Sequence, residues 1–166
     1  MPHRRRSSTR TGRRLRPVLA FMLVAVCLIA GCSSVPRAPE HGAQIARAAA
    51  QVVGTPYHFG GADAQGFDCS GLVVYAYERG GVEVPRTAEE QRHAARPVSF
   101  DDLLPGDVVF FRTRFHFNRH HADHVGIYAG HGRFIHAPGS GSKVAYANLM
   151  DGYYRKHFVS GGRFWD

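Results

Sequence analysis

Cysteine is scarce in this chain of 166 residues, which has three. Two of them, Cys27 and Cys32, lie near the N-terminus, so Cys69 is the only thiol after residue 32. A single thiol cannot form a disulfide within its own chain, which excludes a disulfide-stapled fold there. Long apolar runs are missing as well, because the longest, residues 18–30, falls short of the ~20 residues that a transmembrane helix needs. The sequence therefore does not describe a multi-span membrane protein.

Acidic residues are absent from residues 1–31, which contain seven arginines. The net charge of +8 comes almost entirely from this segment, because the remaining residues carry 14 Lys and Arg against 13 Asp and Glu. A nearly neutral domain lacks the basic surface that nucleic-acid binding needs, so we expect no nucleic-acid partner. With 44% hydrophobic residues, the rest of the chain has the composition of one globular domain.

The N-terminal segment is typical of a secretory signal peptide, which we expect over residues 1–31. Its end, Leu28-Ile-Ala-Gly-Cys32, resembles the bacterial lipobox, in which the cysteine is lipidated and the leader is cut before it. We therefore expect lipidation of Cys32, a lipidated tether over residues 32–40, and a membrane-anchored protein of the cell envelope. Because Ser33 rather than Asp follows, it would lie on the outer membrane, facing the periplasm, in an organism with two membranes. A plain signal peptide with a chance cysteine is the alternative.

Helical and strand patterns follow one another along residues 41–166, which we interpret as one domain. Residues 41–53 are Ala-rich and predict a helix. The apolar block 72–76 predicts a second, buried helix that is capped by Gly80 and Gly81. Strands are expected at residues 97–100, 107–112, 124–129, 133–137, 143–147 and 157–164. The predicted fold class is α+β, with N-terminal helices packed on an antiparallel sheet of about five to six strands.

Cys69 lies at the start of the second helix, where Asp68 or Ser70 can supply the N-cap. The free N–H groups and the positive dipole end at that position stabilise a thiolate, so we expect the pKa of Cys69 to be lowered. Gly71 leaves room for a substrate beside the first turn. Cys69 is therefore the predicted nucleophile. The alternative is a small buried hydrophobe, which would more naturally lie within the apolar block.

A thiol nucleophile needs an imidazole within reach and a third group to orient that imidazole. Residues 124–137 predict a β-hairpin with a three-residue loop. Its register places Gly126 opposite His136, so His124 and His136 point from the same face as diagonal neighbours. We expect this face to pack against the Cys69 helix, so that the pair of imidazoles supplies both the base and the group that orients it.

Histidines also gather in the segment from Thr113 to Asp123, which precedes this hairpin. They are His116, His120 and His121, followed by His124. His120 and His124 have the spacing of two zinc ligands on a helix, but the glutamate of a His-Glu-x-x-His motif is missing. The cluster also borders a strand, where this spacing does not converge on one ion. We interpret the segment as a polar loop over the cleft and expect no metal, with a zinc hydrolase as an alternative.

Four sequence blocks, taken together and in this order, resemble the NlpC-type cell-wall cysteine peptidases, a papain-like family. They are Asp68-Cys-Ser-Gly-Leu-Val73, Leu104-Pro-Gly-Asp-Val-Val-Phe-Phe111, His124-Val-Gly-Ile-Tyr128 and Phe134-Ile-His-Ala137. The resemblance covers about residues 41 to 164 and implies that Cys69 is the nucleophile, His124 the general base and acid, and His136 the group that orients His124. The loop from Thr113 to Asp123 is longer than we expect for the family, which leaves the substrate range open.

The resemblance also implies substrate-binding residues. Tyr57 is similar to a family tyrosine that lines the cleft and assists at the oxyanion site, and Asp68 and Ser70 resemble positions that hold the amine end of a stem peptide. Arg86 matches a common family arginine. Thr87 and Glu90 also have capping-box spacing, which is sufficient to explain that stretch as a helix start.

The family resemblance implies a peptidoglycan hydrolase that cleaves stem peptides, at the bond between γ-linked D-Glu and the diamino acid. We expect peptidoglycan stem peptides as partners and, through the lipid anchor at Cys32, the membrane, together with a monomeric domain and no cofactor. The alternatives are an N-acetylmuramoyl-L-alanine amidase, an acyltransferase on the same scaffold, and a non-catalytic envelope lipoprotein.

Overall fold

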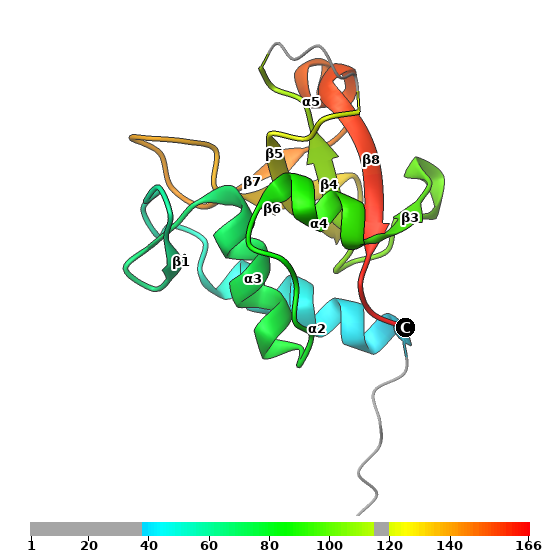
Figure 1. Cartoon of the computed structure of the whole chain (residues 1–166), viewed down its shortest axis with the longest axis horizontal. Helices are drawn as coiled ribbons and strands as arrows, with labels where there is room; N and C mark the ends of the chain where they lie inside the picture. Colours follow the sequence, from blue (N-terminus) through cyan, green and yellow to red (C-terminus); the bar gives the residue numbers. More distant parts are fainter. Residues whose placement is uncertain (1–37, 115–119) are drawn as a thin grey trace, which may run out of the picture. The chain divides into compact units, whose positions relative to one another are not determined.

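The computed structural model describes residues 38–114 and 120–166 of the chain, so the expected signal peptide and the lipidation of Cys32 lie outside the described residues. In chain order, the first three α-helices of the described part precede the strands of the main sheet, and one short α-helix precedes its last strand (Figure 1). The helices are α2 (Ala38–Gln51), α3 (Cys69–Arg79), α4 (Ala88–Ala94), the 3-10 helix η1 (Phe100–Asp102) and α5 (Gly152–His157). The strands are β1 (Ala62–Asp63), β2 (Gly66–Phe67), β3 (Arg96–Val98), β4 (Val108–Phe111), β5 (His124–Gly130), β6 (Arg133–His136), β7 (Ala145–Asn148) and β8 (Phe158–Arg163).

Six of the strands form one antiparallel sheet in the order β3-β8-β4-β5-β6-β7, and β1 and β2 form a separate two-stranded sheet. The predicted α+β class and the six predicted strands are confirmed, with shifts at their ends. Strand β3 ends at Val98 and strand β7 begins at Ala145, each two residues from the predicted bound. Phe100, which we assigned to a strand, begins η1 instead, and Ser99 before it donates a hydrogen bond to Asp102. Helix α2 spans 38–51 rather than 41–53.

The hairpin of β5 and β6 has the predicted register. Ile127 pairs with Ile135 and Tyr128 with Phe134. The loop prediction was wrong by one residue, because Gly130 belongs to β5, where a bulge pairs it with Arg133. Gly130 takes this place with φ of 88°, a backbone conformation that glycine adopts at little cost. The bulge leaves the pairing toward the histidine end of the hairpin unchanged.

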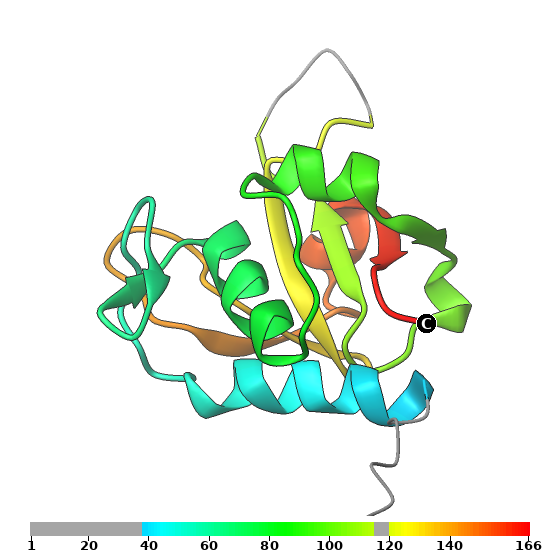
Figure 2. The same ribbon diagram turned by 60° about the horizontal axis from the view of Figure 1, so that its bottom comes forward.

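The two faces of the sheet have separate cores. One core is shared with α2 and α3 and contains Leu72, Val73, Val125, Ile127 and Ile135, among others. The other core lies on the α5 side and contains Phe111, Phe134 and Leu149, with Tyr154 packed against it. In Figure 2 the green helices α3 and α4 lie in front of the strands and the orange-red α5 lies behind them. The sheet is therefore covered on both faces.

Helix α3 is fixed at both ends. The Asp68 side chain accepts a hydrogen bond from the backbone N–H of Gly71 at 2.6 Å, which makes Asp68 the N-cap, and Gly80 is the C-cap. The buried Tyr77 hydroxyl donates to the carbonyl of Gly106 at 2.6 Å, which joins the helix to the turn before β4. Burial of Leu72, Val73 and Ala76 against the sheet then sets the position of the helix N-terminus.

In the part of the chain that the structure describes, no helix combines the length and the apolar character needed to cross a membrane.

Candidate active site

Cys69 is the first residue of α3, as predicted, and its side chain is half-buried. The helix begins there because Asp68 caps it, and because Gly71, two residues on, lies directly against the carbonyl oxygen of Gly61. A Cβ at position 71 would collide with that oxygen, so the role of Gly71 is close packing of the first turn against the loop before β1. This packing holds the thiol at the tip of the helix.

The thiol of Cys69 lies beside the first peptide of β5. Burial raises the pKa of Cys69, while the backbone N–H groups of Val125, Ser70 and Cys69 itself lower it and the charge of Asp68 raises it. The prediction that the helix N-terminus lowers this pKa overall was wrong, because the loss of water around the sulfur outweighs the backbone N–H groups. Cys69 is therefore a neutral thiol when no substrate is bound. The backbone N–H that faces its sulfur belongs to Val125, which follows His124 in the chain.

The rings of His124 and His136 are in contact, as the hairpin register predicts. Nε2 of His124 lies 2.8 Å from Nδ1 of His136, and the two rings meet edge to face. Gly126 makes this possible, because a Cβ there would lie 3.2 Å from the Cβ of His136 and 2.6 Å from the ring of Phe134. Since Nε2 of His124 is used in this bond, Nδ1 is the nitrogen that remains to exchange a proton with another group.

Both imidazoles are buried and uncharged at neutral pH. Burial lowers the pKa of His124 to about 4, with the charge of Asp123 acting in the opposite direction. Burial, followed by the neighbouring His124, lowers the pKa of His136 to about 3. A neutral His124 is able to accept a proton, so the pair has the protonation state that a general base requires.

The sheet face that carries the histidines differs from the prediction. The ring of His124 packs on Phe111, and that of His136 packs on Phe134 and Tyr154, all on the α5 side of the sheet. The neighbours of these histidines, Val125 and Ile135, face α3 instead. The expectation that the histidine face packs against the Cys69 helix was therefore wrong. His124 begins its strand, so its ring lies at the end of β5, where the first peptide of that strand meets Cys69.

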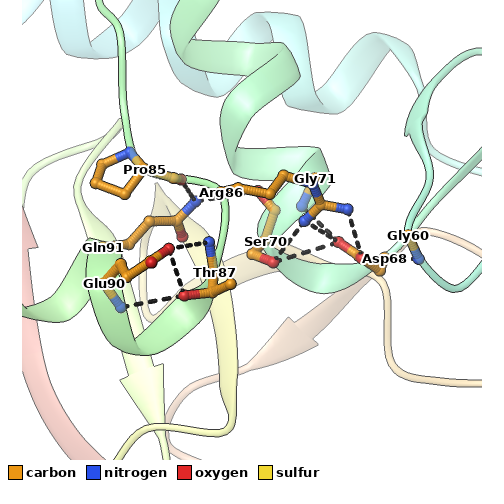
Figure 3. A network of polar contacts seen from close by, with 9 residues as sticks. All are labelled: Gly60, Asp68, Ser70, Gly71, Pro85, Arg86, Thr87, Glu90 and Gln91. Atoms are coloured by element: carbon orange, nitrogen blue, oxygen red, sulfur yellow. Dashed lines mark hydrogen bonds and ion pairs between the residues drawn. The ribbon is translucent and has the colours of Figure 1, made fainter.

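Asp68, Ser70 and Arg86 form one polar network beside Cys69 (Figure 3). The Arg86 guanidinium donates to both carboxylate oxygens of Asp68, at 3.0 and 2.7 Å, and to the Ser70 hydroxyl at 2.9 Å. Asp68 also accepts from the backbone N–H of Gly60 and Gly71. Burial acts to raise the pKa of Asp68, but Arg86 and these N–H groups together hold it below its usual range.

The Asp68 carboxylate already accepts five hydrogen bonds, which occupy all of the about four lone-pair sites of a carboxylate. An incoming amine would therefore compete with Arg86 for Asp68. The role that the family resemblance implies for Asp68, Ser70 and Arg86 stays a prediction.

One cleft of about 580 Å³ brings together five of the residues that we singled out from the sequence. They are Tyr57, Asp68, Cys69, Ser70 and Arg86. Burial raises the pKa of Tyr57, and the nearby Cys69 and Asp68 raise it further, so its hydroxyl stays protonated and able to donate. His124 and His136 line a second, smaller pocket of about 120 Å³, together with Thr113, Pro138, Tyr153 and Tyr154. The Cys69 thiol and the pair of histidines thus line two different pockets.

The two ends of the loop that follows β4 are tied together by Asp123. Its carboxylate accepts hydrogen bonds from Thr113 and from the backbone of Arg114, and the Glu89 carboxylate accepts one from the backbone N–H of Ala122. Histidine 116 lies outside the described residues. Among the residues that are described, no group of three or more His, Cys, Asp or Glu side chains is arranged to hold a metal ion.

Two polar residues near the site, the buried Gln91 and the half-buried Tyr154, were not singled out from the sequence. Gln91 is fully buried and donates from Nε2 to the carbonyls of Ser70 and Pro85, which joins α4 to the start of α3. A polar residue one turn after the buried Ala88 was the available signal. Tyr154 lies beside His136, with its hydroxyl 3.5 Å from Nε2, and no local pattern indicates which face of the sheet α5 covers.

The helix-tip thiol, the strand-end histidines and the antiparallel sheet define a papain-like fold. Residues 54–163 match the NlpC/P60 family, and the chain belongs to that family. It is 44% identical over 117 residues to the protein named murein DD-endopeptidase MepH of Escherichia coli, a match that covers 68% of this chain and 42% of that protein. It is 42% identical over 111 residues to the bifunctional muramidase/DL-endopeptidase CwlT of Bacillus subtilis, covering 66% of this chain and 32% of that protein.

Solved structures are similar as well. NlpC1 from Trichomonas vaginalis superposes with a TM-score of 0.69 and is 32% identical, over 75% of this chain and 44% of that one. This chain thus spans less than half the length of the curated relatives just named. The papain-like NlpC/P60 fold is confirmed.

Proposed function

We propose that the protein is a peptidoglycan hydrolase that cleaves amide bonds of the stem peptide, with Cys69 as nucleophile. The observation that carries the proposal is the position of the Cys69 thiol: it lines the cleft, and the N–H of Val125, next in the chain to His124, faces it. Relatives with the same domain are named as murein endopeptidases, which supports this substrate class.

The proposed reaction is acyl transfer. As the sulfur of Cys69 attacks the carbonyl carbon, its proton passes to Nδ1 of His124, which is neutral because burial lowers its pKa. The negative charge on the carbonyl oxygen is stabilised by backbone N–H groups at the start of α3 and by the Tyr57 hydroxyl. His124 then gives the proton to the leaving amine, and the carbon–nitrogen bond breaks.

The second half of the reaction releases the acyl group. A water molecule attacks the thioester carbon, His124 accepts a proton from that water, and the carbon–sulfur bond breaks. The proton returns from His124 to the sulfur, which restores the thiol. Throughout both halves His136 holds the ring of His124 through the 2.8 Å bond to Nε2.

For the cleaved bond we propose the amide between γ-linked D-Glu and the diamino acid, as in a DL-endopeptidase. The name of CwlT supports a DL-endopeptidase, whereas the name of MepH supports cleavage between two D-residues. Mass spectrometry of muropeptides from digested sacculi separates the two, because the products differ in the number of residues left on each stem. Release of intact stem peptides would instead indicate an amidase.

The catalytic proposal is tested by Cys69→Ala and His124→Ala, each measured for release of muropeptide fragments. We expect turnover to fall below detection in both, with the far-ultraviolet circular dichroism unchanged. The matched control is His131→Asn, at an exposed turn with φ of 53°, a conformation that Asn tolerates, and it should keep full activity. Muropeptide release retained by Cys69→Ala would contradict Cys69 as the nucleophile, and absence of release by the unsubstituted protein would favour a non-catalytic protein.

For the location, we propose anchoring to the envelope membrane through lipidated Cys32, with the catalytic domain as a monomer. The lipobox-like residues before Cys32 support the anchor. Mass spectrometry of the purified protein should find an acylated Cys32 at the N-terminus, and Cys32→Ser should release the domain into the soluble fraction. An unmodified residue 32 would contradict the anchor, and sedimentation equilibrium of the Cys32→Ser protein tests the monomer.

A further inference from the structure

We propose that Tyr154 is a positioning residue, whose hydroxyl oxygen accepts a hydrogen bond from Nε2–H of His136 and thereby sets the tautomers of both histidines. The inference deepens the proposed function, on which its kinetic part rests. It starts from a row of three groups, His124, His136 and Tyr154, which lines a pocket separate from the cleft lined by Cys69.

The row is continuous. Nε2 of His124 lies 2.8 Å from Nδ1 of His136, and Nε2 of His136 lies 3.5 Å from the Tyr154 hydroxyl. One ring nitrogen, Nδ1 of His124, is left at the end of the row. Each neutral imidazole carries one proton on one of its two ring nitrogens. Whether the Tyr154 hydroxyl donates to Nε2 of His136 or accepts from it therefore determines which nitrogen of each ring is protonated.

Two arrangements of protons satisfy the row. If Tyr154 accepts from Nε2–H of His136, then Nδ1 of His136 accepts from Nε2–H of His124, and Nδ1 of His124 is bare. If Tyr154 donates to Nε2 of His136 instead, then Nδ1–H of His136 donates to Nε2 of His124, and Nδ1 of His124 carries a hydrogen. Only the first arrangement lets His124 accept the proton of the Cys69 thiol.

The surroundings hold Tyr154 in place for this role. Its ring meets the rings of Phe111, Phe134 and His136 edge to face, at centroid distances of 5.4, 4.9 and 5.4 Å. Helix α5 is held in turn by Arg155, whose guanidinium lies 4.2 Å from the ring centre of Phe100. Burial raises the pKa of Tyr154, so the hydroxyl stays neutral, and its own hydrogen has room in the pocket of about 120 Å³ that it lines.

The direct test is the tautomer state, read from the imidazole ¹⁵N chemical shifts of histidine-labelled full chain in detergent. In the unsubstituted protein we expect Nε2–H and a bare Nδ1 on both His124 and His136. A proton on Nδ1 of His136 in the unsubstituted protein would overturn the proposal without reference to activity. This measurement stands even if the chain proves not to cleave peptidoglycan.

The variant test is Tyr154→Phe, which keeps the ring packing and removes the hydroxyl. We expect His136 to show a mixture of tautomers and kcat to fall about three- to tenfold, the effect of one neutral hydrogen bond, with KM within about twofold. Tyr146→Phe is the matched control, because Tyr146 is exposed on β7, outside the pocket of the two histidines, and its ring lies under Arg133. Unchanged tautomers in Tyr154→Phe would assign Tyr154 a packing role only.

Discussion

At the scale of single residues, Cys69 keeps the proton on its sulfur and His124 is neutral when no substrate is bound. Burial raises the pKa of the thiol and lowers that of His124 to about 4, so both groups are neutral at pH 7. In the proposed reaction the proton therefore moves during attack on the substrate rather than before it, and the neutral imidazole of His124 acts as the base.

The reactivity of Cys69 toward a small alkylating agent should follow from its raised pKa. We expect the rate of modification by iodoacetamide in the folded chain to keep rising beyond pH 9, since the thiolate is the reacting species. Mass spectrometry of the peptide that contains Cys69 measures the rate separately from the other two cysteines. The urea-unfolded chain is the control and should level off at a lower pH; a folded-state plateau below pH 7 would contradict the neutral thiol.

The buried histidines should make stability depend on pH. The pKa is about 4 for His124 and about 3 for His136 in the folded state, against 6.5 for an ordinary histidine. Between these values the unfolded chain binds more protons than the folded chain. The contribution of the two histidines to the free energy of unfolding is therefore complete above pH 6.5 and is lost as the pH drops toward 4. Urea unfolding at pH 7.5 and pH 5 should show this loss.

His136→Asn removes one of the two groups and should make the loss between pH 7.5 and pH 5 smaller. His131→Asn, at the exposed turn, is the control and should leave the loss unchanged. The window lies above the pKa of carboxylates such as Asp68 and Glu89, whose hydrogen bonds lower their pKa values, so they add little to the slope. Equal slopes in both variants would contradict the assignment.

At the scale of the element, helix α3 carries Cys69, the proposed nucleophile, and the start of the helix depends on Asp68. The carboxylate caps the helix through Gly71 and holds Arg86 against Ser70. The same side chain therefore serves the local structure of the helix and the shape of the cleft, so its two roles need separate variants.

Asp68→Ala should lower the free energy of unfolding by about 1–2 kcal/mol through loss of the cap. Asp68→Asn keeps an oxygen that can accept from Gly71 and should lose less stability, although the ion pair with the 40% exposed Arg86 is gone. Urea unfolding compares the two directly. A loss in the Asn variant as large as in the Ala variant would show that the charge of Asp68, rather than its cap, stabilises the helix.

At the scale of the whole domain, the central strands are joined to the C-terminal strand by a buried ion pair. Arg163, on β8, donates from Nε and Nη2 to the carboxylate of Asp107 at 2.6 and 2.7 Å. Asp107 directly precedes β4 and is fully buried. Arg163 also lies over the Trp165 ring, at 4.4 Å from its centre. The pair thus ties β8 and the segment after it to the middle of the sheet.

Arg163→Met should lower the free energy of unfolding by about 3–5 kcal/mol, because the Asp107 carboxylate is left buried without its partner. Adding Asp107→Asn should recover part of the loss by removing the unpaired charge. The control is Arg133→Met at an exposed position over Tyr146, where we expect less than about 1 kcal/mol. No recovery in the double variant would contradict the account of the ion pair.

Much of the fold and of the candidate site could be predicted from the sequence. The α+β class, the six strands of the sheet and the contact of His124 with His136 follow from hydrophobic patterns and hairpin register, and all three are present. These features depend on alternation along a strand and on turn chemistry, which are local properties. The family resemblance was likewise carried by four short blocks and is confirmed.

Three features were decided only by the tertiary structure: the raised pKa of Cys69, the sheet face on which the histidines lie, and the contact of Tyr154 with His136. A sequence shows that two side chains share a face, but which helix covers that face depends on how distant elements pack. Burial, which outweighs the backbone N–H groups at Cys69, likewise arises from residues far apart in the chain. Local pattern thus determined the elements and the pairing of the histidines, and long-range packing decided their surroundings and their charge.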